Sequence, residues 1–161
     1  MSPAPRLDDA EVLRRIRTLR VERAMRLIAD ARAAVDAAAA VVAQRLEQVE
    51  ALRRALDGLR EAIGSELASE LPRWSSLIFA RRQRLADQLE RAEDKLLTAR
   101  DRLGDAQKAL QHARTELASA QWRKQIADDL ARRARRELAI ELERRLEREA
   151  EPLLRAARSA R

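Results

Sequence analysis

Few residues in this 161-residue chain could do chemistry, and their spacing points away from catalysis. There is no cysteine and His112 is the only histidine, so zinc has no thiolate or histidine pair to bind. A Ser-His-Asp arrangement would have no second candidate base. The three glycines are isolated, whereas a loop that cradles phosphate needs several close together. We therefore expect a protein that is not an enzyme and that uses no cofactor or metal.

Carboxylates are numerous, but they alternate with arginine at helical spacings. Acidic and basic residues three or four positions apart on a helix form surface ion pairs. Slender helices also offer no concave, desolvated pocket for acid–base work. We therefore interpret these carboxylates as part of a solvated helix face, and we place His112 on the same kind of surface. The clearest run of such carboxylates comprises Glu141, Glu143, Glu147, Glu149 and Glu151.

The composition is typical of long helices and coiled coils. Charged residues make up 38% of the chain and aromatic residues only 2%, with a formal net charge of +7. The longest apolar stretch, Ala37 to Ala43, is far shorter than the roughly 18 residues of a membrane span. Met1 to Asp9 contains no apolar signal core, so we expect a cytoplasmic protein. The basic excess could attract nucleic acid or acidic lipid, but no base-reading motif supports specific nucleic-acid binding.

Two stretches carry apolar residues at alternating spacings of four and three. This heptad spacing keeps one narrow face of a helix against a partner helix. We predict a first helix over about residues 8–63, with Asp8 or Asp9 as its cap, and a second over about 76–151. The first seam comprises Ala24, Ile28, Ala31, Val35, Ala38, Val42, Leu46, Val49, Leu52 or Arg53, Leu56, Leu59, Ile63 and Leu67. The second comprises Leu85, Leu89, Ala92, Leu96, Ala99, Leu103, Ala106, Leu110, Ala113, Leu117, Ala120, Lys124, Ala127, Ala131, Ala134 and Leu138.

The break between the two seams predicts a hairpin turn over 64–75. Gly64 can end a helix in a left-handed conformation, and Pro72 fits the first turn of a new helix while pushing Leu71 toward extended geometry. An extra helical turn at 66–69 is compatible with the sequence. The fold class is therefore all-α, a long antiparallel two-helix coiled-coil hairpin over 8–151, preceded by a disordered leader (1–7). Pro152 is expected to end the second helix, leaving a frayed tail (152–161).

Folding the chain about this turn predicts which residues face each other. Residues whose numbers sum to about 144 should lie side by side. Ala37 to Ala40 would then meet Gly104 and Ala106 at the closest approach of the two backbones. The second helix would extend past the start of the first from about Leu138. We expect Trp122 to pack across the first helix near residues 21–24.

Aromatic and basic residues mark the two ends of the predicted hairpin. Trp74 and Phe79 lie near the turn, either as an apolar plug that closes it or as an exposed anchor for a protein partner. Two arginine clusters fall at the open end, where they could meet an acidic protein surface or a phosphate backbone. The clusters are Arg14, Arg15, Arg17, Arg20 and Arg23 on the first helix, and Arg132, Arg133, Arg135, Arg136, Arg144 and Arg145 on the second.

The segment from Leu19 to Ala24, LRVERA, follows an arginine-rich start. It resembles the N-terminal signature of the YscO/HrpO proteins of type III secretion systems, which are related to the flagellar protein FliJ. Trp74, which follows Arg73, is similar to a Lys-Trp segment in YscO. The resemblance implies an antiparallel hairpin like the central stalk of rotary ATPases, at the cytoplasmic face of the export apparatus. It also implies contacts with the hexameric secretion ATPase, the export-gate membrane protein and chaperones of secreted substrates.

These considerations predict a monomeric stalk and chaperone-escort protein that couples the ATPase to the gate. Its contact with the membrane would be indirect, through protein partners. The candidate partner-binding residues are Arg20, Glu22 and Arg23 for the ATPase, and Trp74 and Phe79 for the gate or a chaperone. The alternative is a generic coiled-coil scaffold or adaptor without a role in secretion. A basic helix that binds DNA or membranes without specificity is a third class, and its affinity would fall steeply with salt.

Overall fold

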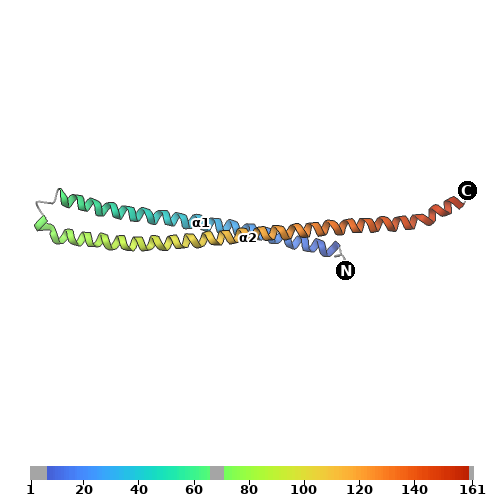
Figure 1. The fold of residues 1–161 in the computed structure, drawn as a ribbon, viewed down its shortest axis with the longest axis horizontal. Coiled ribbons are helices and arrows are strands. Elements are labelled where there is room, and N and C mark those ends of the chain that lie inside the picture. The colour runs from blue at the N-terminus through green and yellow to red at the C-terminus, as the bar shows by residue number, and fades with distance from the viewer. Residues whose placement is uncertain (1–6, 66–70, 160–161) are drawn as a thin grey trace. The chain divides into compact units, whose positions relative to one another are not determined.

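A computed structural model of the chain describes residues 7–65 and 71–159. Within these ranges the chain forms two α-helices and no strand: α1 (Leu7–Gly64) and α2 (Leu71–Ser159). The two helices pack against each other as an antiparallel hairpin, which confirms the predicted all-α fold (Figure 1). The leader expected at 1–7 lies outside the described residues except for Leu7, which begins α1. The extra turn considered at 66–69 also lies outside them.

The chain divides into two compact units, each of which contains part of both helices. Unit 1 combines Met1–Leu27 with Ala113–Arg161, and unit 2 is Ile28–His112. Both predicted arginine clusters therefore belong to unit 1. In each unit a stretch of α1 lies beside a stretch of α2 that runs the other way (Figure 1).

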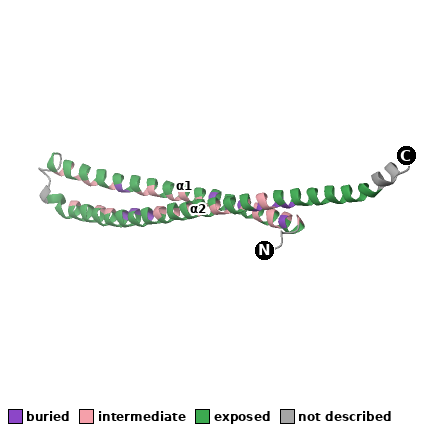
Figure 2. Ribbon diagram, turned by 45° about the vertical axis from the view of Figure 1, so that its right-hand side comes forward, coloured by how far each residue is buried: buried purple, intermediate pink, exposed green. Residues whose placement is uncertain are grey.

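The predicted seam forms the core of each unit. In unit 2, Val49 packs with Ala92 and Leu96, and in unit 1, Ala10 packs with residues 131 and 134 of α2. Every predicted seam residue of α2 from Leu85 to Ala134 is at least partly buried (Figure 2). The same holds for the α1 seam from Ala24 to Ile63, apart from the exposed Leu46 and Arg53. The heptad spacing thus identified the buried face of both helices.

Two ion pairs between the helices fix their register. In unit 2 the Arg53 guanidinium lies 2.7 Å from the Glu93 carboxylate, and in unit 1 Arg135 pairs with Glu11. The residue numbers in each pair add up to 146, within two of the predicted sum. Beyond the last buried residue, Ala134, the described side chains of α2 are all exposed. This part of α2 extends past the N-terminal end of α1 at Leu7, so α1 does not cover it. This matches the overhang expected from about Leu138.

The end of α1 differs from the expected left-handed glycine. α1 does end at Gly64, but no described glycine has a positive φ. Instead, Ser65 closes the last turn: its backbone N–H donates to the Glu61 carbonyl at 3.1 Å, and its hydroxyl donates to the same oxygen at 2.9 Å. A serine that bonds a carbonyl four residues back satisfies an acceptor that a helix end otherwise leaves free.

α2 is longer than predicted at both ends. It begins at Leu71, so the expected extended geometry of Leu71 was wrong, although Pro72 does lie in the first turn. There the missing proline N–H would have no helical acceptor in any case. α2 also continues through Pro152 to Ser159, where we expected an end. Pro152 is exposed, so water can solvate the carbonyl that loses its donor, and the helix tolerates the proline.

Asp8 and Asp9 lie in the first turn of α1, not before it as a cap. Their negative charges face the partial positive charge at a helix N-terminus, which stabilises the start of α1. Among the helices that the structure describes, none is long and apolar enough to cross a membrane.

Gly104 was expected at the closest approach of the two helices, but its surroundings are open. A Cβ atom added at Gly104 or at Gly58 would meet no atom within 4 Å beyond its own helical neighbours. Glycine in a helix interior is about 1 kcal/mol less favourable than alanine. We therefore expect Gly58→Ala and Gly104→Ala each to raise the free energy of unfolding by about 1 kcal/mol, measured by urea denaturation followed by circular dichroism.

Gly64→Ala serves as the control, because Gly64 is the last residue of α1 and the gain should be smaller there. A loss of stability in Gly104→Ala would show that the backbones do approach closely at this position, as the sequence suggested.

Candidate protein-docking surfaces

The LRVERA segment of α1 divides into two sets of side chains. Val21 and Ala24 are buried in the seam of unit 1. Arg20, Glu22 and Arg23 are exposed, as Leu19 is. The apolar pair therefore holds α1 against α2, while the three predicted partner-binding residues are accessible.

The exposed arginines around this segment form no ion pair with the residues that the structure describes. No ion pair joins Arg15, Arg20, Arg23 or Arg26 to another residue that the structure describes. Arg14, by contrast, is bound to Glu11 at 3.0 Å. The other four arginines are all exposed, so α1 of unit 1 presents positive charge that no described ion pair compensates.

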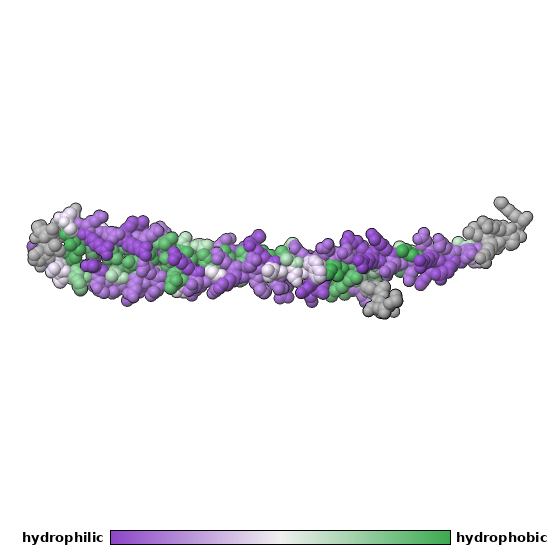
Figure 3. All heavy atoms as spheres, viewed as in Figure 1, coloured by the Kyte–Doolittle hydropathy of each residue, from purple (hydrophilic) through white to green (hydrophobic). Residues whose placement is uncertain are grey.

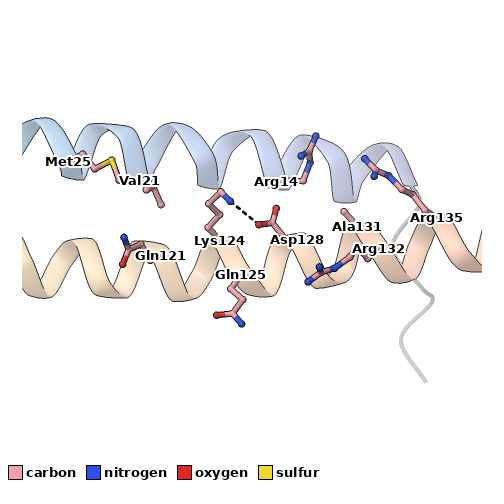
Figure 4. Close-up of a pocket in the computed structure, with 10 residues that line it drawn as sticks. All are labelled: Arg14, Val21, Met25, Gln121, Lys124, Gln125, Asp128, Ala131, Arg132 and Arg135. Carbon is pink, nitrogen blue, oxygen red and sulfur yellow. Dashed lines mark hydrogen bonds and ion pairs between the residues drawn. The ribbon is translucent and has the colours of Figure 1, made fainter.

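A groove of about 660 Å³ runs between the helices of unit 1, and each cation that lines it is held in an ion pair (Figure 4). Lys124, which occupies a seam position, lies 2.9 Å from Asp128. Arg132 pairs with Asp129 on its own helix. Arg14 and Arg135, which also line the groove, share Glu11. The groove is therefore polar packing between the helices, in which internal ion pairs compensate most but not all of the positive charge.

Glu11 is the acceptor that ties the two helices together in unit 1. The hydrogen bond from Arg135 is the main reason that the pKa of Glu11 lies below its ordinary value. Partial desolvation opposes the shift, and the hydrogen bond from Arg14 adds to it. Because the pKa is lowered on folding, this pairing stabilises the hairpin above the ordinary glutamate pKa. The stabilisation is lost as the pH falls through the lowered folded-state pKa.

This arrangement predicts a measurable titration. By carboxyl NMR, Glu11 should titrate at lower pH in the wild-type chain than in Arg135→Gln. Arg136→Gln, which removes a neighbouring charge outside the ion pair, should change the Glu11 pKa far less. Equal pKa values in wild type and Arg135→Gln would contradict the pairing.

The chain matches no protein-family model, no curated protein and no solved structure. Its own side chains carry the information on function. The informative ones are large apolar side chains that lie close together at the surface, because a contiguous exposed apolar patch marks an interaction site more often than scattered apolar residues do.

Trp74 and Phe79 do not form a single cluster. Five residues along a helix turn through about 140°, so the two rings leave α2 in different directions. Trp74 lines a groove of about 660 Å³ in unit 2, together with Leu59 of α1. Phe79 is 67% exposed and lies outside that groove. Of the two alternatives that the sequence left open, the apolar plug does not describe Phe79, and both aromatic residues are exposed.

The groove beside Trp74 combines apolar walls with cations. The Arg73 guanidinium lies 5.5 Å from the centroid of the Trp74 ring, a cation–π contact. Leu77 and Ile78 line the groove, and Arg81 and Arg84 border it. Neither of these two arginines forms an ion pair with a described residue.

Trp122 was expected to pack across α1, and this prediction was wrong: its side chain is 66% exposed. Trp122 follows the seam residue Ala120 by two positions and precedes Lys124 by two. Two residues turn a helix through about 200°, so Trp122 points away from α1. His112 is exposed, as predicted.

The sequence interpretation missed a set of exposed aliphatic residues on α1 of unit 1. Hydrophobic side chains emerge between hydrophilic ones on the face shown in Figure 3. The heptad-like spacing of the missed residues was visible in the sequence, but we assigned the start of the seam to Ala24. The set comprises Val12, Ile16, Leu19 and Leu27.

Within the described ranges there is also no group of three or more potential metal-binding side chains.

Proposed function

We propose that this chain works by binding other proteins, as a stalk and chaperone-escort component of a type III secretion export apparatus. In this role it couples the secretion ATPase to the export gate. The proposal rests on the contrast between the side chains that hold the two helices together and those that remain exposed. The seam residues pair α1 with α2. Large apolar residues remain exposed in both units, together with arginines that form no ion pair with a described residue.

The LRVERA segment supports the ATPase contact. Arg20, Glu22 and Arg23 are exposed, and neither arginine has a counter-ion among the described residues. Charged groups that are held on a helix and not engaged internally can steer and orient an oppositely charged partner. We therefore assign this side of unit 1 to the hexameric ATPase.

The groove at Trp74 supports a second contact in unit 2. A half-exposed tryptophan in an apolar groove is the kind of residue that dominates binding energy when a partner covers it. We assign this groove, with Phe79 on a separate face, to the export gate or to a chaperone.

The assignment to the ATPase can be tested by charge reversal. Arg20→Glu combined with Arg23→Glu should abolish stimulation of the cognate hexameric secretion ATPase and leave the helix content unchanged. The matched control is Arg114→Glu with Arg123→Glu, which makes the same charge change on α2 of the same unit, also at exposed positions. This control should retain stimulation.

Full stimulation by the Arg20/Arg23 variant would reject the assignment. If the wild-type chain neither stimulates nor co-purifies with such an ATPase, the role in secretion fails. The chain would then be a coiled-coil scaffold or adaptor of another assembly.

A further inference from the structure

The outer face of α1 in unit 1 carries a second apolar stripe, which we call the outer stripe: Val12, Ile16, Leu19 and Leu27. These side chains are 56%, 43%, 63% and 51% exposed. Val12 lies two residues after the buried Ala10, and Leu19 lies two residues before the buried Val21. Because two residues turn a helix through about 200°, Val12 and Leu19 lie opposite the seam. Ile16 and Leu27 lie on the flank between the two sides, since Leu27 is one residue, or about 100°, from the buried Ile28.

The outer stripe therefore gives α1 exposed apolar side chains on a second side, apart from the seam. A helix in water buries the sides that are apolar, so two apolar sides call for two neighbours. Unit 1 supplies only one, because α2 covers the seam side. The first three residues are spaced by four and three, which is the spacing that accepts side chains of another helix.

The charges around the outer stripe restrict what that neighbour can be. Arg15, Arg20, Arg23 and Arg26 are exposed on or beside it, and none forms an ion pair with a described residue. Between Val12 and Leu27 the only acidic residue is Glu22. A basic partner would be repelled here, whereas carboxylates on either side of an apolar ridge would each find a guanidinium.

We propose that the outer stripe docks an amphipathic helix with acidic flanks, supplied by a partner protein. The partner helix lays its apolar ridge along Val12, Ile16, Leu19 and Leu27, and its carboxylates meet Arg15, Arg20, Arg23 and Arg26. This inference rests on the proposed protein-binding function and names the chemistry of the partner at unit 1. At 1.5 Å per residue, the stripe from Val12 to Leu27 extends over about 22 Å, or roughly four helical turns.

A protein helix fits the outer stripe better than a lipid surface does. Helices that lie in a membrane interface use a broad apolar face, often with tryptophan or phenylalanine. The outer stripe holds no aromatic residue. Asp8 and Asp9 also lie in the first turn of the same helix, where they would face anionic headgroups.

The test uses the full chain and two synthetic helical peptides about three heptads long. Both peptides carry Ile and Leu at the seam positions, and the flanking positions are all Glu in one and all Lys in the other. We expect the Glu peptide to bind, measured by fluorescence anisotropy, and the Lys peptide not to bind. Ile16→Glu combined with Leu19→Glu should weaken binding of the Glu peptide by at least about tenfold.

The matched control is Leu97→Glu with Ile140→Glu, which replaces one exposed leucine and one exposed isoleucine outside the outer stripe. It should bind the Glu peptide as the wild type does. Circular dichroism should show the same helix content in both double variants, since all four side chains are exposed.

Several results would overturn the proposal. Equal binding of the Glu and Lys peptides would show that the arginines do not select the partner. An equal loss of binding in the control variant would show that the outer stripe is not the binding site. Binding to vesicles of anionic phospholipid that depends on Ile16 and Leu19, without peptide binding, would assign the stripe to a membrane. A wild-type dimer in sedimentation that Ile16→Glu with Leu19→Glu dissociates would assign it to a second copy of this chain.

The outcome is separable from that of the proposed function. If the chain binds the Glu peptide but does not stimulate a secretion ATPase, the proposal that the outer stripe docks an acidic helix stands and the role in secretion is rejected. ATPase stimulation that survives Ile16→Glu with Leu19→Glu, together with no peptide binding, would reject the outer stripe alone.

Discussion

Val49→Asp should unfold the helix pairing of unit 2 under conditions in which the wild-type chain is folded. Val49 is 1% exposed and packs with Ala92 and Leu96. An aspartate there would place an unpaired charge between two apolar helix faces. Leaving a charge buried without a partner costs about 3–5 kcal/mol, which is a large part of the 5–15 kcal/mol that stabilises a typical domain.

Val41→Asp is the matched control, because Val41 is the same residue type on the same helix and lies at an exposed position. Its aspartate stays in water, so we expect a change of less than about 1 kcal/mol in the free energy of unfolding. Urea denaturation followed by circular dichroism gives both values. Coincident unfolding curves for the two variants would mean that Val49 does not lie in the seam.

The second large effect is expected from Ala131→Phe in unit 1. Ala131 is 2% exposed and packs with Ala10 and Ala134, small side chains against which Leu7 also packs. A phenyl ring cannot fit without pushing the helices apart, and such overpacking costs about 1–3 kcal/mol or more. The start of α1 should then detach from α2, and trypsin should cut faster after Arg15, Arg17 and Arg20.

Ala139→Phe provides the comparison, because Ala139 lies on the exposed part of α2 beyond the end of α1. Its digestion pattern over residues 7–27 should match that of the wild type. If Ala131→Phe is digested no faster than Ala139→Phe, the packing of Ala131 against Ala10 is wrong.

The seam was predictable because heptad spacing is a property of the backbone period and needs no knowledge of the partner. The helix ends were less predictable. Proline at 152 removes one hydrogen bond, but the helix formers on either side outweigh that loss, so α2 continues to Ser159. The last turn of α1 is completed by hydrogen bonds from Ser65 and not by a left-handed Gly64. The spacing of apolar residues does not predict such local hydrogen bonds.

The docking surfaces were only partly predictable. Arg20 and Arg23 follow from the sequence because charged residues off the seam must face solvent. Trp122 was misplaced because its size was given more weight than its position two residues from the seam. The outer stripe was missed because Ile16 and Leu19 have the same spacing as a seam, and spacing alone does not say which of two apolar faces meets α2.

The nature of the buried residues differs between the two units, with a consequence for how the hairpin opens. Among the described residues of unit 1, five of the six buried hydrophobic residues are alanines and Val21 is the exception. Those of unit 2 include Ile28, Val49 and Leu96 beside two alanines. Each leucine replaced by alanine removes three buried carbons, or about 2 kcal/mol of transfer free energy. Backbone amides at the start of α1 should therefore exchange with solvent deuterium sooner than those around Val49. A partner protein that separates α1 from α2 would therefore do so more easily in unit 1 than in unit 2. Unit 1 is also the unit in which exposed arginines of α1 form no ion pair with a described residue.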